Sequence, residues 1–474
     1  MQQSRLDVMT LSESMQLLSQ KLGREITGEE VKQAEALVKE LGYLPLALEL
    51  AAAQVAGGKS WAVLLENIQR EIARLKTLDR PSARDVTDEA DLKRFSLRAS
   101  LNLSVKLLEK ETREGFIWLG ILPDDVNITP GMAAVLWGMN DERDARDKLK
   151  DLRRKALLLD GVALPDGKST YRLHDLFHDI ARHLLSAPPK PRRRGDLSGL
   201  GIGLAKTHGI FLEKYRRLTD NHLWHTLPND GYIHQHLVWH FEKAGKIEEI
   251  HGLLAEESKN GTNGWYETCD RLGRMGIFIN NVARAWELAE VDWDEHRLPQ
   301  VVGLQCRYAL ITASINSLAA KLPADLLVAL VKHDFWTPGQ GLAYALQKPR
   351  LEDKVESLTK LVDYLPENLK KQALSEVLAV VQQIKHESNR IEIFSTLADK
   401  LTPELLPEAL AATRQIQKKS HRAQALSALV DKLTPELLPE ALDAARQIDT
   451  HRDRALILTA LANRSPEAVM SVIS

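Results

Sequence analysis

The sequence has 474 residues, which is too long for one hydrophobic core and predicts about three domains. Its 63 basic and 65 acidic residues nearly cancel, so no overall charge would draw the chain to nucleic acid or to an anionic membrane. No stretch approaches the roughly 20 apolar residues of a membrane span, and the first residues lack the apolar core of a signal peptide. We therefore expect a cytoplasmic protein, and its two cysteines match no metal or redox spacing.

Residues 1–85 are predicted to form a helical bundle. In TGEEVKQAEALVKEL, Thr27 as N-cap and Glu30 three places later indicate a capping box, and Gly42 ends that helix. The next helical stretch runs into GGKS, which looks like the end of a phosphate-binding loop. That loop requires GxxxxGK[ST] after a strand, but Ala53 stands at the first glycine position and the preceding residues favour helix. We interpret GGKS as a connection between two helices.

Residues 95–187 combine helices with one hairpin. ALLLDGVALPDGKSTYRLH indicates two short strands joined from Pro165 to Gly167, and helices followed by such a hairpin predict a winged-helix domain. The helix RDARDKLKDLRRK mixes acidic with basic residues instead of presenting one basic face, which disfavours nucleic acid as a partner. Residues 188–203 are predicted to be a linker, because prolines, glycines and a basic run replace the apolar periodicity.

Residues 204–295 are predicted to be helical and contain a cluster of histidines. His236 and His240 have the i, i+4 spacing of zinc sites on helices. However, Leu237 replaces the catalytic glutamate of the HEXXH motif, and no cysteine lies nearby. We therefore expect core or capping histidines, no metal site and no enzyme activity, with a metallohydrolase built on residues 222–240 as the rival hypothesis.

The end of the chain repeats itself with a period of 32 residues, since LTPELLPEAL begins at 401 and again at 433. Each unit has room for two short helices, and neither can bury its apolar face alone, so the units of residues 300–474 are expected to stack into a solenoid. Arginines occupy one equivalent position in three units, namely Arg390, Arg422 and Arg454. Such a column could bind an acidic or phosphorylated partner, or it could form ion pairs between neighbouring units.

Two motifs carry a resemblance to NB-ARC proteins, the signal-transducing ATPases of the STAND class. GYLPLALEL at 42–50 resembles the GLPL motif of the first ARC bundle, and RLHDLFHDIA at 172–181 resembles the MHD motif of the winged-helix domain, with leucine in place of methionine. In that family the proline of GLPL lies against the adenine ring, and the histidine of MHD contacts the β-phosphate of ADP. The resemblance therefore implies that Pro45 and His174 contact the nucleotide.

The resemblance covers roughly residues 8–290 and includes an apoptosome-factor-like helical domain at 204–295. It implies a mainly α fold: an ARC helical bundle, a winged-helix domain with a small β-wing, then an α-helical domain and solenoid repeats. The phosphate loop and the Walker B acids of the family have no counterpart in the sequence, so we expect the chain to begin about where the ATPase domain would end.

From these features we expect the regulatory and sensor portion of a STAND signalling protein, without catalytic activity of its own. ADP or ATP would bind only if a P-loop domain were supplied in cis or in trans, and a protein partner would bind the repeats of residues 300–474. The alternative is a solenoid adaptor for protein–protein interaction whose NB-ARC half is vestigial.

Overall fold

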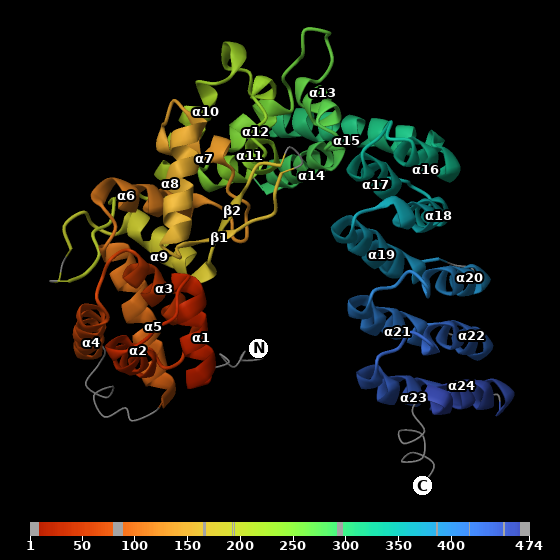
Figure 1. The fold of residues 1–474 in the computed structure, drawn as a ribbon. Coiled ribbons are helices and arrows are strands. Elements are labelled where there is room, and N and C mark those ends of the chain that lie inside the picture. Colours follow the sequence, from red (N-terminus) through yellow and green to blue (C-terminus); the bar gives the residue numbers. More distant parts are fainter. Residues whose placement is uncertain are drawn as a thin grey trace. The chain divides into compact units, whose positions relative to one another are not determined.

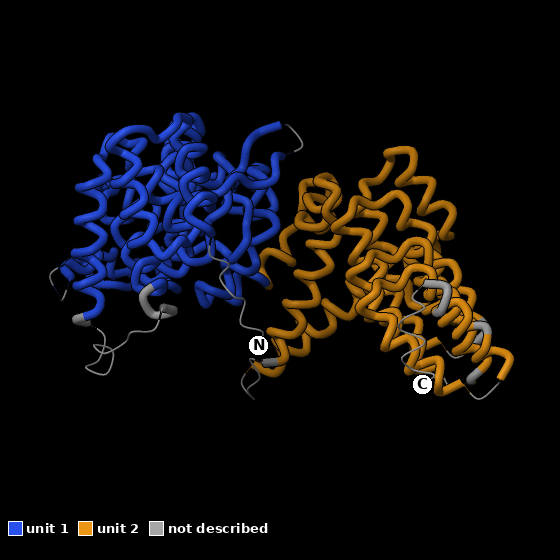
Figure 2. The backbone as a smooth tube through the Cα atoms, turned by 60° about the horizontal axis from the view of Figure 1, so that its bottom comes forward, with its two compact units in different colours: residues 1–250 blue, residues 251–474 orange. Residues whose placement is uncertain are grey.

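The computed structural model describes residues 9–464 except 79–88, 165–166, 192, 194, 292–296, 385–386, 417 and 449–450. The chain divides into two compact units, residues 1–250 and 251–474 (Figure 2), and each is described by itself. Most of the described residues lie in helices, and the strands among them form one antiparallel pair. The predicted mainly α fold is confirmed.

The first unit begins with a bundle of five helices (Figure 1): α1 (Leu11–Leu22), α2 (Glu29–Glu40), α3 (Pro45–Ala56), α4 (Trp61–Leu78) and α5 (Glu89–Lys106). Helix α1 starts with a capping box of Thr10 and Glu13 and ends at Gly23 in the left-handed conformation. Helix α5 packs against α3 and α4, and its Phe95 and Ala99 belong to the same buried apolar cluster as the rest of the bundle. The α5 helix thus extends across residue 95, where the sequence predicts the next domain to begin.

Two sequence predictions about the bundle have different outcomes. GGKS connects α3 to α4, as predicted, because α3 ends at Ala56 and α4 begins at Trp61. The capping box at Thr27 is wrong: the N-cap of α2 is Gly28, with φ of 65° and no side-chain cap. The carboxylate of Glu30, which a capping box would place on the backbone N–H of Thr27, instead accepts a hydrogen bond from Arg24 at 2.6 Å.

The hairpin follows a second group of helices: α6 (Lys110–Trp118), the short 3-10 helix η2 (Leu119–Ile121), α7 (Pro130–Trp137) and α8 (Glu142–Arg154). Strand β1 (Leu158–Asp160) pairs antiparallel with β2 (Tyr171–Leu173), and Leu158 faces Leu173 in the register. The two short strands are as predicted, whereas Pro165 of the predicted turn lies outside the described residues. Helix α9 (Asp175–Ser186) follows β2 directly.

The segment 195–203, part of the predicted linker, packs along the end of α9. The backbone N–H of Leu200 donates to the carbonyl of Leu184 at 2.9 Å, and that of Ile202 donates to the carbonyl of Leu185 at 2.8 Å. A Cβ at Gly199 would lie 2.2 Å from the carbonyl oxygen of Ala187, so only glycine permits this approach. The remaining helices of the unit are α10 (Leu204–Arg216), η3 (Asp220–His222), η4 (Trp224–Thr226) and α11 (Ile233–Lys243), and α12 (Ile247–Leu253) follows at the boundary of the units.

The second unit is an array of helices. It contains α13 (Gly264–Arg271), α14 (Met275–Val291), α15 (Leu298–Lys321), α16 (Ala324–Lys332), α17 (Pro338–Leu346), α18 (Leu351–Leu361) and η5 (Val362–Tyr364). The repeats follow as α19 (Glu367–Val381) with α20 (Glu387–Leu397), α21 (Leu406–Arg414) with α22 (Lys419–Val430), and α23 (Leu438–Arg446) with α24 (His451–Arg464). The Thr-Pro turns become the short helices η6 (Pro403–Leu405) and η7 (Pro435–Leu437).

The repeats stack as the sequence predicts. First helices pack on first helices and second helices on second helices, so that α19, α21 and α23 form one column and α20, α22 and α24 another (Figure 1). Among the described residues, no single helix is long and apolar enough to cross a membrane. Helices α15 and α16 reach that length and composition only together, and they are bent by 89° at their junction.

Candidate functional site

Pro45 and His174, the two residues that the resemblance assigns to nucleotide contact, each lie at the N-terminus of a helix in the first unit. Pro45 is the first residue of α3, where its missing N–H leaves no bond unmade, and its side chain is exposed. His174 is the half-buried N-cap of α9, and its Nδ1 accepts a hydrogen bond from the backbone N–H of Leu176 at 3.3 Å. Each residue therefore has a local structural role in addition to any contact with a ligand.

A cleft of about 570 Å³ lies between the bundle and the hairpin, with walls from α1, α3, α8 and β1. Its basic side chains are already paired: Lys21 contacts Glu49 at 3.1 Å, and Arg153 donates to Asp160 at 3.0 Å. Neither Pro45 nor His174 lines this cleft. The geometry therefore provides no open cradle for a phosphate at this position.

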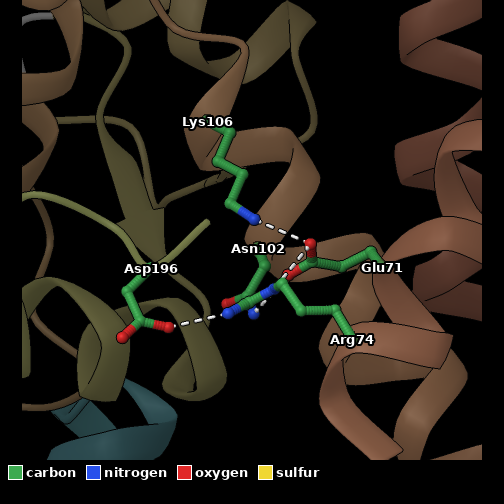
Figure 3. A network of polar contacts seen from close by, with 5 residues as sticks. All are labelled: Glu71, Arg74, Asn102, Lys106 and Asp196. Atoms are coloured by element: carbon green, nitrogen blue, oxygen red, sulfur yellow. Dashed lines mark hydrogen bonds and ion pairs between the residues drawn. The ribbon is translucent and has the colours of Figure 1, made fainter. Parts of the chain in front are cut away.

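A buried ionic network joins α4 to α5 and is drawn in Figure 3. The side chain of Glu71 on α4 is 6% exposed and accepts hydrogen bonds from Arg74 Nη2 at 2.7 Å and from Lys106 Nζ at 2.7 Å. Asn102 Nδ2 on α5 also donates to Glu71, at 3.2 Å. Burial alone raises the pKa of Glu71, but the hydrogen bonds and charges of Arg74 and Lys106 outweigh burial and lower it below its ordinary value. Glu71 is therefore a buried carboxylate that stays ionised.

The same network reaches the segment that follows α9. Arg74 Nη1 donates to Asp196 Oδ1 at 2.7 Å, so one guanidinium binds both the bundle and the segment 195–203 (Figure 3). Gly195 has φ of 91°, and a Cβ there would lie 2.8 Å from Cδ of Arg74. Beside this contact is a cleft of about 580 Å³ with walls from α4, α5, α9 and the segment. Arg74 thus fixes the chain beyond the hairpin region to the bundle.

The sequence signal for this network is one charged residue on an apolar helix face. Glu71 lies three residues after Ile68 and four before Leu75, and both of these side chains are buried. A carboxylate at that helical position needs a buried partner. One partner, Arg74, lies three residues later on the same helix, whereas Asn102 and Lys106 come from α5, and no local pattern indicates that α5 approaches.

One histidine of the predicted cluster, His240, belongs to a buried hydrogen-bonded chain with His208 and Tyr232 in the first unit. His240 uses both ring nitrogens: Nδ1 contacts Nδ1 of His208 at 2.8 Å, and Nε2 contacts the hydroxyl of Tyr232 at 2.7 Å. Burial lowers the pKa of His208 to about 4 and also lowers that of His240, so both rings are neutral near pH 7. Within the described ranges, no group of three or more His, Cys, Asp or Glu side chains is placed to hold a metal ion.

The arginine column of the second unit makes contacts within each repeat. Arg390 Nε donates to the carbonyl of Ile384 at 2.8 Å, and Arg422 Nε donates to the carbonyl of Ile416 at 2.9 Å. These carbonyls lie three and two residues beyond the last residue of the first helix, so each arginine reaches back from the second helix to the chain just after the first. Arg454 contacts the ring of His451 at 3.4 Å. The repeated spacing of six residues from isoleucine to arginine is the sequence signal that would have predicted this contact.

Ion pairs between neighbouring repeats come from a different column. Lys400 contacts Asp363 at 2.6 Å, and Lys432, which is 32 residues later, contacts Asp399 at 3.0 Å. Lys400 lies three residues beyond the end of α20, and Lys432 lies two residues beyond the end of α22. The repeats are therefore joined by lysine and aspartate pairs as well as by apolar contacts.

Comparisons with known proteins agree with the motifs. No protein-family model matches the sequence. The chain is 31% identical over 209 residues to the regulatory protein AfsR of Streptomyces griseus, which covers 44% of this chain and 20% of AfsR. It is 22% identical over 269 residues to the apoptotic protease-activating factor 1 of Danio rerio, which covers 56% of this chain and 19% of that protein. The chain is weakly similar in sequence to these two proteins, which supports its resemblance to the STAND class.

The chain spans about a fifth of the length of the curated relatives that it matches. Among solved structures, it matches a STAND protein with a tetratricopeptide repeat sensor from Pyrococcus horikoshii, at 12% identity and a TM-score of 0.29. That match covers 96% of this chain and 56% of the other. The predicted resemblance to the STAND class is confirmed by the curated relatives.

Proposed function

We propose that this chain is the regulatory and sensor portion of a STAND signalling protein and has no catalytic activity alone. The observation that carries the proposal is the joint occurrence of two features in one chain: sequence homology to two regulatory proteins of the class, and a stacked helical array at the end. In the proposal, the helices α1–α5 are the ARC bundle, the helices α6–α9 with the hairpin of β1 and β2 are a winged-helix domain, and residues 300–474 are the sensor.

The proposed gating role of His174 is supported by its hydrogen bonding. Because Nδ1 accepts the N–H of Leu176, the proton of the neutral ring is on Nε2, which can donate to a phosphate oxygen. His174 also stands at the N-terminus of α9, where the helix dipole favours an anion. With a P-loop domain in cis or in trans, His174 would hold the β-phosphate of ADP and Pro45 would lie against the adenine, so that ADP stabilises the resting state.

Reconstitution with a P-loop domain tests this gating. His174→Ala removes one hydrogen bond to a charged group, worth about 1.5–3 kcal/mol, and should speed the release of a fluorescent ADP roughly 10- to 100-fold. His183→Ala is the matched control, because His183 is exposed on the same helix. Equal ADP retention by the parent and the His174 variant would defeat the assignment. The chain alone should show no ATP turnover, since a phosphate loop is absent from its sequence.

The proposed sensor role assigns partner binding to the repeats. Stacked helix pairs present one extended surface, and each pair depends mainly on its neighbours for packing. Removing residues 365–474 should therefore abolish binding of the natural protein partner and leave the first unit folded. A truncated chain that still binds that partner would refute the sensor role, and unfolding of the first unit on truncation would make the repeats a structural buttress instead. The rival adaptor hypothesis requires that deletion of residues 1–190 leaves partner binding unchanged.

A further inference from the structure

A cleft of about 540 Å³ runs beside α10 in the first unit. The opposite side of α10 is buried, through residues such as Phe211 and Leu212. Three residues that line the cleft are small, namely Ala205, Gly209 and Ala244, and the last of these is the C-cap of α11. A Cβ at Gly209 would meet no atom within 4 Å, so the space above this residue is open. A partner can therefore approach the backbone of α10 closely here.

Charged residues mark both ends of one stripe along this side of α10. Spacings of four, three and four residues separate Lys206, Ile210, Glu213 and Arg217, and all four residues line the cleft. At 3.6 residues per turn, these spacings keep the four side chains within about 60° of the helix circumference, so they share one face. Arg217 is the C-cap and still has helical backbone angles. The two cations are therefore eleven residues apart, or about 16 Å along the axis.

The cleft is positively charged, although the whole chain has a net charge of -2. Glu213 is the one acidic side chain among the described residues that line the cleft, and it pairs with Lys246 at 3.1 Å. Lys214 donates to a backbone carbonyl of α7 at 2.5 Å. Lys206 and Arg217 are exposed and form no ion pair with any residue that the structure describes. The two cations at the ends of the stripe are thus available to an anionic partner.

The walls of the cleft favour a helical partner over an extended one. They come from α10 and from the turn that follows α11, and no described strand borders them. An extended peptide would find no strand edge to bind, whereas a helix satisfies its own backbone groups and needs only side-chain contacts. On such a helix, two carboxylates eleven residues apart lie on the same face, because three turns span about 11 residues. Their spacing matches that of Lys206 and Arg217.

We propose that this cleft is a docking site for an acidic amphipathic helix of a protein partner. Two carboxylates of that helix, three turns apart, pair with Lys206 and Arg217, and the apolar side chains between them cover Ile210 and the small residues of the cleft. A nucleic acid fits less well, because Glu213 lies between the two cations and would face the phosphates. The site lies in the first unit and does not depend on the sensor proposed for the repeats.

Fluorescence anisotropy with the full chain and a labelled synthetic helix tests the proposal. The probe is an alanine-rich peptide of about 20 residues, with two glutamates eleven residues apart and leucines between them on the same face. Exposed ion pairs are weak, so the Kd should be on the order of 10–100 µM and should rise with salt. Lys206→Glu combined with Arg217→Glu should raise the Kd at least roughly 10-fold. Lys32→Glu combined with Arg143→Glu is the matched control and should bind like the parent, because both are exposed basic residues of the first unit outside the cleft.

A charge swap and a filled cleft distinguish docking from misfolding and from general charge attraction. The Lys206 and Arg217 double variant should bind a peptide with lysines in place of the two glutamates, and the parent should not. Gly209→Leu should abolish binding of the acidic peptide without changing any charge, because its side chain fills the open space above α10.

The proposal is overturned if the parent does not bind the acidic peptide up to about 1 mM, or if the double variant binds it equally well. Failure of the swapped pair, or undiminished binding by Gly209→Leu, overturns it as well. Tighter binding of a single-stranded DNA of about 20 nucleotides than of the peptide would assign the cleft to nucleic acid instead.

Discussion

Replacing Glu71 by glutamine should destabilise the first unit strongly, although the shape of the side chain is kept. Glu71 is the buried charge that both Arg74 and Lys106 bind at 2.7 Å. Glutamine retains one carbonyl oxygen, but it replaces the other oxygen with an amide group whose N–H bonds point toward a cation. Two positive side chains would then remain close together without their shared anion.

The magnitude follows from the burial of the partners. Removing one member of a buried ion pair costs about 3–5 kcal/mol. The side chains of Arg74 and Lys106 keep 20% and 24% exposure, so each regains some hydration and the loss should be about 3 kcal/mol, at the lower end of that range. For a unit of this size, such a loss lowers the melting temperature by roughly 6–12 °C.

Lowering the pH should destabilise the first unit by protonating the carboxylate of Glu71. The folded-state pKa of Glu71 lies below the ordinary value of 4.5, so its contribution is fully present above pH 4.5 and is lost as the pH falls through the folded pKa. Glu71→Gln has no such carboxyl. Its unfolding free energy should therefore depend less on pH below 4.5 than that of the parent.

Calorimetry of the full chain at neutral and acidic pH measures both effects. Glu66→Gln is the matched control, because Glu66 pairs with Arg70 on the same helix but these side chains are 65% and 69% exposed. An exposed pair contributes at most about 1 kcal/mol, so the control should melt close to the parent. If Glu71→Gln melts like the control, or keeps the acid dependence of the parent, the buried network does not stabilise the unit as argued.

Three further results are expected. Because burial lowers the folded pKa of His208 to about 4, well below its ordinary 6.5, the unfolding free energy should fall by about 1.4 kcal/mol per pH unit as the pH drops from 6.5 toward 4, and urea titrations should show this slope reduced in His208→Gln. Gly120→Ala places a Cβ 2.4 Å from the backbone nitrogen of Arg182 and should lower the stability of the first unit by about 1–3 kcal/mol or more, whereas Gly209→Ala meets no atom within 4 Å and should not be destabilising. Leu410→Ala opens a cavity beneath α21 and costs about 2–5 kcal/mol, and hydrogen exchange should speed up in α19–α24 but not in α1–α9.

Much of this protein is determined by short-range sequence patterns. The period of 32 residues predicted two helices per unit and their stacking, because each helix has one apolar face that only the next repeat can bury. Ala53 alone excludes the phosphate loop, and the turn residues from Pro165 to Gly167 between two short stretches predicted both strands. These features can be predicted because each depends on residues that are close together in the sequence.

Other features depend on segments that meet only in the folded chain. Glu71 and Arg74 are neighbours on α4, but Lys106, which binds Glu71, and Asp196, which binds Arg74, come from segments that no periodicity links to α4. Only the tertiary structure brings these segments together, because the packing of the whole unit sets which charged side chains reach the buried carboxylate and its arginine.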